Sequence, residues 1–270
     1  MRTRLLTLTL GLIVLVPVGR AQQVTTDHEW CRREQNSYNN GRRYERHCEV
    51  RTYDLGRVSS FTVDAGSNGG IKVIAWDRPT AELHARVTAQ ARTEEEARRL
   101  ADGVEIRTGG TIRADIPDDR EDNEWASVSY ELRVPRSSDL DLEANNGGIA
   151  IEGVTGRIRF ETSNGGVALT DVGGDVEGRT SNGGLNVALS GDRWEGEGLN
   201  VRTSNGGVRL SVPEGFGADL EVGTTNGQID LGFPVTVEGH IGRRVQTTLG
   251  RGGPPVRVIT TNGGVILRRR

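Results

Sequence analysis

The residues able to ligate a metal or to transfer a proton are scattered along this sequence. Its four histidines, His28, His47, His84 and His240, stand far apart, and none belongs to an HExxH-type zinc pattern. No GxSxG elbow, Walker A motif or GxGxxG fingerprint is present. The carboxylates are numerous, but no pair stands out for glycoside hydrolysis. We therefore expect no catalytic residue, no metal, no cofactor and no enzyme activity.

One acidic run gathers hard oxygen ligands of the kind that Ca²⁺ prefers. Residues 117–124 read PDDREDNE and hold five carboxylates: Asp118, Asp119, Glu121, Asp122 and Glu124. The run lacks EF-hand spacing, and no Asp-bearing nonapeptide of calcium-binding β-rolls recurs in the chain. We interpret it as a solvated hairpin loop, with calcium binding as the alternative.

The N-terminus is typical of an export signal. Arg2 and Arg4 precede the apolar run 5–19, and Gly19-Arg20-Ala21 suits cleavage, so the mature chain would begin near Gln22. An uncleaved membrane anchor is the alternative, but the run is short for a span of about 20 residues. We expect a signal peptide at 1–21 and no transmembrane segment after its removal.

The two cysteines, Cys31 and Cys48, follow this signal closely. In an oxidising compartment, a disulfide between them is the default interpretation. It would close a polar segment at 22–57, which has little apolar surface of its own to bury.

The composition favours a thin core with many tight turns. The 270 residues include 38 glycines, roughly twice the usual share of about 7%, and only 4% aromatic residues. The net charge is −3, and without a basic excess a nucleic-acid partner is not expected.

Residues 58–137 predict strands around one helix. Apolar residues alternate along 81–91 and 125–135. Between these strands, 93–103 predicts a helix, because Thr93 and Glu96 form a capping box and Gly103 suits the end. We expect this section to cap one end of the repeats that follow, and Arg268-Arg269-Arg270 to discourage stacking at the other end.

Residues 138–270 are repetitive. TSNGG occurs at 162–166, 180–184 and 203–207, and alternating apolar residues flank each copy. The first steps between Asn-Gly pairs are 18 residues long. A short period with apolar alternation predicts one supersecondary unit copied many times.

Two architectures fit this repeat. In an all-β solenoid, each repeat is one coil and Asn-Gly-Gly forms a corner; in a hairpin meander, Asn-Gly forms the hairpin turn. Recurrence of the same side chains at the same place favours the solenoid. Its corners would need positive φ, which Asn tolerates and Gly adopts freely. The stacked amides would form a ladder, made by Asn146, Asn164, Asn182, Asn205, Asn226 and Asn262.

Trp194 lies in a polar insertion within the repeats, SGDRWEGEG at 190–198. If exposed, it offers a surface for stacking on a glycan or contacting a protein; the alternative is that it covers the flank of the solenoid.

Five arginines lie at outward positions of the repeats: Arg157, Arg159, Arg179, Arg202 and Arg209. Together with Glu161 and Glu177 they make a mixed-charge face. Such a face confers solubility or carries repeated weak contacts.

The stretch SYELRVPRSSDLDLEANNGGIAIEGVTGRIRFETSNGGVALTDVGGDVEGRTSNGG at 129–184 carries a family resemblance. With the upstream section WDRPTAELHARVTAQARTEEEARRLADGV, it resembles the bacterial putative-adhesin family, domain of unknown function 4097, over roughly 58–270. The resemblance implies a β-solenoid and an adhesin-like label, but no common activity. Residues 232–255, which we interpret as a protruding loop, and the segment 22–57 depart from the family pattern.

These observations predict an exported, non-enzymatic β-solenoid with a structural or adhesin-like role at the bacterial cell envelope. We expect it in the periplasm, on the cell surface or secreted, with a cell-envelope protein or a glycan as its partner. The alternative is a polysaccharide-binding or polysaccharide-cleaving protein on a β-helix scaffold.

Overall fold

The structure is a computed structural model that describes residues 23–35, 44–118, 124–234 and 242–270. The predicted signal peptide, His240 and residues 119–123 of the acidic run lie outside the described residues.

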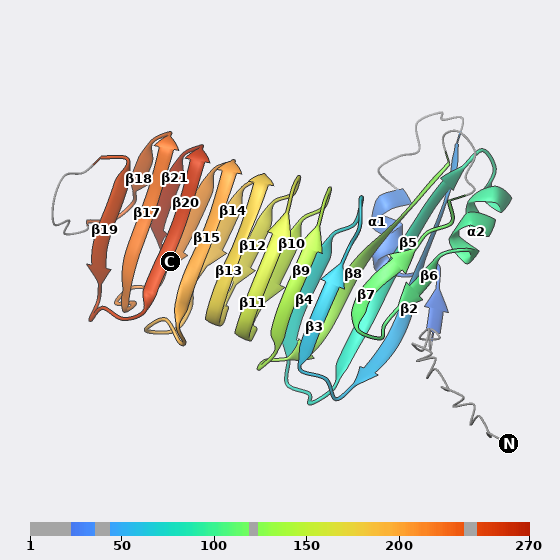
Figure 1. Cartoon of the computed structure of the whole chain (residues 1–270), viewed down its shortest axis with the longest axis horizontal. Helices are drawn as coiled ribbons and strands as arrows, with labels where there is room; N and C mark the ends of the chain where they lie inside the picture. The colour runs from blue at the N-terminus through green and yellow to red at the C-terminus, as the bar shows by residue number, and fades with distance from the viewer. Residues whose placement is uncertain (1–22, 36–43, 119–123, 235–241) are drawn as a thin grey trace, which may run out of the picture.

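Two large sheets run along the molecule and face each other across the core (Figure 1). Sheet A has 11 strands, in the order β1 (Gln23–Thr25), β2 (Glu45–Gly56), β5 (Ala81–Ala91), β8 (Trp125–Pro135), β4 (Ile71–Trp76), β10 (Ile149–Glu152), β12 (Val167–Thr170), β14 (Leu185–Ala188), β16 (Val208–Val212), β21 (Val265–Arg269) and β18 (Ile229–Leu231). Sheet B has 10 strands, in the order β19 (Arg244–Leu249), β17 (Ala218–Asn226), β20 (Pro255–Asn262), β15 (Gly198–Asn205), β13 (Gly173–Asn182), β11 (Thr155–Thr162), β9 (Asp139–Ala144), β3 (Ser60–Asp64), β7 (Thr111–Asp115) and β6 (Glu105–Arg107).

Each repeat forms one coil, with one strand in each sheet. Successive coils pair in parallel and in register, so that Thr162 lies opposite Thr180 and Thr180 opposite Thr203. A hairpin meander would pair neighbouring strands antiparallel. The parallel ladders confirm the predicted β-solenoid.

The core is a column of Val, Leu and Ile side chains between the two sheets, as the alternating burial of the strands requires. One coil differs from the others, because Gly178 occupies an inward position at which the neighbouring coils have Phe160 and Val201. A Cβ at Gly178 would lie 2.3 Å from the ring of Phe160 in the next coil. Phe160 therefore fills the space that Gly178 leaves, which keeps the column close-packed.

The coils do not stack in the order of the sequence. The last coil, β20 and β21, pairs with β15 and β16 on one side and with β17 and β18 on the other. The final repeat of the chain thus lies inside the stack, between two coils that precede it.

The solenoid also begins earlier than the predicted boundary at 138. Strands β3 and β4 form a complete coil, because they pair in parallel with β9 and β10 in the same register as the repeats. The turn Ser67-Asn68-Gly69-Gly70 is the corner of this coil. The segment 22–57 is likewise not only a stapled loop, because the 12-residue strand β2 pairs along its length with β5.

Helix α2 (Glu94–Asp102) covers the end of the core where sheet B stops short of sheet A (Figure 1). Its capping box forms as predicted between Thr93 and Glu96. Its buried residues are Ala97, Leu100 and Ala101, of which Leu100 and Ala101 pack in the core. The shorter helix α1 (Glu29–Gln35) packs near β2 and is tied to it by the disulfide between Cys31 and Cys48.

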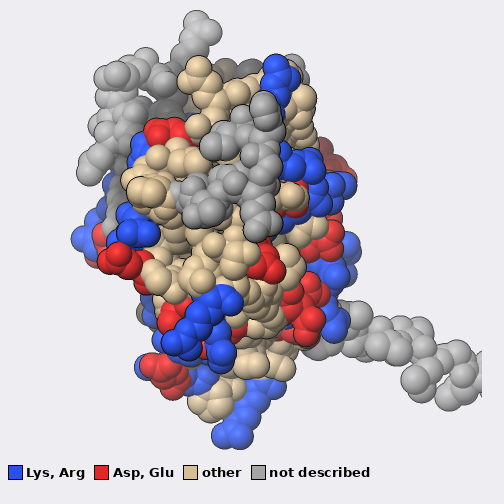
Figure 2. Space-filling model, turned by 90° about the vertical axis from the view of Figure 1, so that its left-hand side faces the viewer, with Lys and Arg blue, Asp and Glu red and all other residues tan. Residues whose placement is uncertain are grey.

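The opposite end of the stack is made by β18 and β19, not by the C-terminal arginines. The insertion 232–255 contributes β19, which pairs antiparallel with β17, so the insertion is more than a protruding loop. Arg268 and Arg269 instead bond Asp230 and Glu214 beside the last coils. Seen end-on, positive and negative side chains are interspersed over this end (Figure 2).

Candidate functional site

The Thr and Asn of the TSNGG motifs and of their near copies join one coil to the next. The threonine hydroxyls donate to the carbonyl of the first glycine in the neighbouring coil, at 2.7–2.8 Å: Thr162 to Gly147, Thr180 to Gly165, Thr203 to Gly183, Thr260 to Gly206 and Thr224 to Gly263. The exposed asparagines form a second ladder, in which each Nδ2 donates to the next Oδ1 at 2.8–3.1 Å, in the order Asn226, Asn262, Asn205, Asn182, Asn164, Asn146 and Asn68. Asn68, from the early coil, extends the predicted set.

The first glycine of each motif is required by a close approach between coils. A Cβ at Gly165 would lie 2.0 Å from the carbonyl oxygen of Gly147, and Gly183 has the same contact with Gly165. Of these first glycines, only Gly263 has a positive φ, at 157°, so positive φ is not the general reason, contrary to the sequence interpretation. Among the described residues, Asp171 is the one non-glycine residue with positive φ, so no asparagine of the ladder adopts it.

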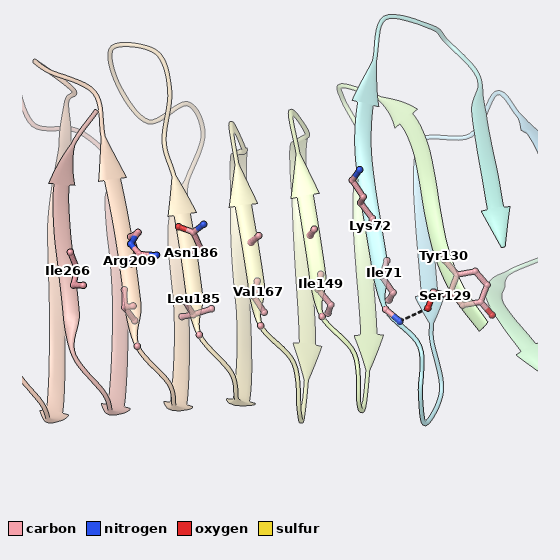
Figure 3. A pocket seen from close by; sticks show the side chains of 18 of the residues that line it. Ile71, Lys72, Ser129, Tyr130, Ile149, Val167, Leu185, Asn186, Arg209 and Ile266 are labelled. Carbon is pink, nitrogen blue, oxygen red and sulfur yellow. Dashed lines mark hydrogen bonds between the residues drawn. The ribbon is translucent and has the colours of Figure 1, made fainter. Parts of the chain in front are cut away.

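A groove of about 900 Å³ runs along the outer face of sheet A, next to these corners (Figure 3). One row of outward side chains follows it, because the strands are in register: Lys72, Ala150, Ala168, Asn186, Arg209 and Ile266. The second glycine of each motif lies beside this row, at Gly70, Gly148, Gly166, Gly184, Gly207 and Gly264. Sequence reasoning missed this site. The sequence feature that indicates the groove is a small outward residue two positions after the second glycine, namely Ala150 after Gly148 and Ala168 after Gly166.

The floor of the groove is smooth across β10 and β12, where glycine, Ala150 and Ala168 leave it without long side chains, whereas longer side chains of the same row project from the flanking strands. Its backbone groups are already bonded between coils: Ile149 N–H donates to Gly166 O at 3.0 Å, and Val167 N–H donates to Gly184 O at 2.9 Å. A ligand on this face therefore meets a flat surface, with polar contacts only from side chains.

The charged residues that line the groove are all cations. Lys72, Arg86 and Arg209 contribute, and the lining contains no Asp, Glu, His or Cys. Lys72 Nζ lies 3.5 Å from Glu131 outside the lining, whereas Arg209 forms no ion pair with any described residue. At the α1 end, the guanidinium of Arg86 lies 4.6 Å from the ring centroid of Trp30.

The outer face of sheet B carries both signs of charge. Arg179 bonds Glu161 of the neighbouring coil at 2.8 Å, and Arg159 lies 3.8 Å from Glu177. Arg157 and Arg202 belong to strands of the same sheet, but Arg209 lies in sheet A. The predicted mixed-charge face is thus sheet B without Arg209.

Trp194 is not an exposed binding residue. Only 3% of its surface is accessible, and its Nε1–H donates to Gly174 O at 3.2 Å. The insertion 190–198 folds back over the flank of the solenoid, so that the ring covers the core next to Val172 and Phe216. The alternative, that Trp194 covers the flank, is correct.

A polar cluster is buried between β2 and α2. Glu49 accepts a hydrogen bond from His47 Nε2 at 3.1 Å and one from Arg51 Nε at 2.7 Å. Arg51 also donates to the carbonyls of Ala101 and Val104 at the end of α2. Burial raises the pKa of Glu49, but the hydrogen bonds from His47 and Arg51 outweigh burial and hold the pKa below its ordinary value. Because every member has a partner, the cluster anchors α2.

No group of three or more His, Cys, Asp or Glu side chains within 23–35, 44–118, 124–234 and 242–270 is arranged to hold a metal ion. Within the same ranges, no helix has the length and apolar character needed to cross a membrane.

Three solved structures are similar in part: a "putative cell adhesion protein" from Clostridium sporogenes (9% identity, TM-score 0.42, 84% of this chain and 100% of that one), a "putative adhesin" from Bacteroides fragilis (11%, 0.31, 82% and 97%) and a "putative adhesin" from Parabacteroides merdae (7%, 0.30, 82% and 95%). No curated protein matches the chain. The model of the Toastrack DUF4097 family matches residues 96–268. The chain therefore belongs to the Toastrack DUF4097 family, as its repeats suggested.

Proposed function

We propose that this protein is an exported, non-enzymatic β-solenoid with a structural or adhesin-like binding role at the bacterial cell envelope. The observation that carries the proposal is the groove on sheet A. It places glycines, small side chains and three cations along one continuous face. A rigid stack of coils presents such a face without the ordering cost of a flexible loop.

Two further features support the proposal. The disulfide between Cys31 and Cys48 suits an oxidising compartment outside the cytoplasm. The groove lining contains no carboxylate, whereas glycoside hydrolysis uses a pair of them. The disulfide supports export, and the lining of the groove favours binding over hydrolysis.

The test is binding of the purified mature chain, from Gln22, to an array of glycans, peptidoglycan and envelope proteins, with glycan turnover assayed in parallel. Saturable binding without released products is the expected result. Released sugars would overturn the non-enzymatic role, and the absence of any binding would overturn the adhesin-like role.

A further inference from the structure

The groove on sheet A is positively charged in a protein whose net charge is −3. In the register of the strands, Lys72 and Arg209 stand on either side of Ala150, Ala168 and Asn186. At the usual strand spacing of about 4.8 Å, the two cations lie roughly 20 Å apart, and the groove from β8 to β21 is roughly 30 Å long. This spacing suits an extended ligand that carries several negative charges.

The floor discriminates between kinds of extended ligand. A peptide that adds to a sheet needs free backbone N–H and C=O groups, but on this face they are bonded between coils. An acyl chain gains most from an enclosed cavity, whereas this groove is open to solvent. Sugar rings, in contrast, place a flat C–H face on a smooth floor and direct their hydroxyl and carboxylate groups toward the rims.

We propose that the groove binds a linear polysaccharide whose sugar rings bear carboxylates. The proposal rests on the binding role proposed above and names the class of ligand. The rings lie over Gly148, Gly166 and Gly184, while Lys72 and Arg209 pair with carboxylates of the chain. Asn186, next to Ala168 in the same row, and Ser129 offer hydrogen bonds, and Trp30 closes the end near α1.

The direct test is calorimetric titration of the mature chain with oligosaccharides of polygalacturonate. Three comparison probes isolate the features of the ligand. Methyl-esterified polygalacturonate keeps the rings and removes the charge, polyglutamate keeps the charge on a peptide, and phosphatidylglycerol vesicles present charge on a lipid. We expect binding to polygalacturonate that weakens as salt is raised, and at least about tenfold weaker binding to each comparison probe.

Variants locate the site. Lys72→Gln and Arg209→Gln should each weaken binding about fivefold, and Ala168→Glu, which places a carboxylate on the floor, should abolish it. Arg202→Gln is the matched control, because it removes an exposed arginine from the opposite sheet. Thermal unfolding of each variant verifies that the solenoid is intact.

The outcomes separate this inference from the proposed function. Binding of any comparison probe within about tenfold of polygalacturonate, or groove variants that bind like Arg202→Gln, would overturn the inference. Binding to an isolated envelope fraction with none to polygalacturonate would overturn the inference alone. Binding to neither would overturn both.

Discussion

The asparagine rungs differ in how many neighbours they bond. Asn182 donates to Asn164 and accepts from Asn205, whereas Asn226, at the end of the ladder, donates to Asn262 and accepts from no described side chain. Each exposed hydrogen bond stabilises by about 0.5–1 kcal/mol. We expect Asn182→Ala to lower the free energy of unfolding by about 1–2 kcal/mol, and Asn226→Ala by about half as much. Urea unfolding measures both, and equal losses would contradict a ladder in which each rung bonds two neighbours.

The buried carboxylate of Glu49 makes stability depend on pH. Its pKa is lower in the folded protein than its ordinary value of 4.5, so its contribution is complete above that value and is lost as the pH falls through the folded pKa. Glu49→Gln leaves the buried Arg51 without its charged partner and should cost about 3 kcal/mol at neutral pH. The difference between wild type and variant should be unchanged above pH 4.5 and should shrink as the pH falls below it, through the folded pKa. A difference that stays constant with pH would contradict the ionised pairing.

Among the elements, the corner between strands tolerates substitution at one glycine and not at its neighbour. A Cβ at Gly165 would meet the carbonyl of Gly147 at 2.0 Å, whereas a Cβ at Gly166 would meet Gly184 O at 3.6 Å, an ordinary contact. We expect Gly165→Ala to cost about 3 kcal/mol or more, because neighbouring coils must separate. Gly166→Ala, the matched control, should cost less than about 1 kcal/mol. Similar melting temperatures for the two variants would show that the coils separate readily at this corner.

Because Phe160 fills the space beside Gly178 on the neighbouring strand, we expect the stability effects of substitutions at the two positions to be strongly coupled. Gly178→Val alone clashes with the ring, and Phe160→Val alone leaves a cavity, each at a cost of about 2–4 kcal/mol. The double variant restores two medium-sized side chains, so it should be more stable than the sum of the single costs implies. Additive costs in a double-mutant cycle would contradict this complementarity.

For the molecule as a whole, the order of the coils is open to direct measurement. Asn200 lies opposite Arg257 on the neighbouring strand, while Glu221 lies one strand further away. Adjacent strands lie about 4.8 Å apart, within the range that a disulfide spans, and the next strand is about twice as far. The pair Asn200→Cys with Arg257→Cys should therefore oxidise readily, and Asn200→Cys with Glu221→Cys should not. Preferential oxidation of the second pair would mean that the coils follow the order of the sequence.

Much of this fold could be predicted from the sequence, because repeated alternation and repeated corners encode a stack of coils. The order of the last two coils could not, since β17 and β20 carry the same Thr and Asn at the same register. The burial of Trp194 depends on how an irregular insertion folds back, which no period reveals. The groove could not be predicted either, because the sequence does not show that Ala150 and Ala168 face outward next to the glycines of neighbouring coils.

The corners have a further consequence for the chemical lifetime of the protein. An asparagine followed by glycine is the sequence most prone to spontaneous deamidation, in which the glycine nitrogen attacks the side-chain amide and ammonia leaves. The ladder holds each amide, and the nitrogens of Gly183, Gly206 and Gly263 donate to carbonyls of neighbouring coils. We therefore expect these hydrogen bonds to slow deamidation while the protein stays folded, and isoaspartate to accumulate in chains that stay unfolded.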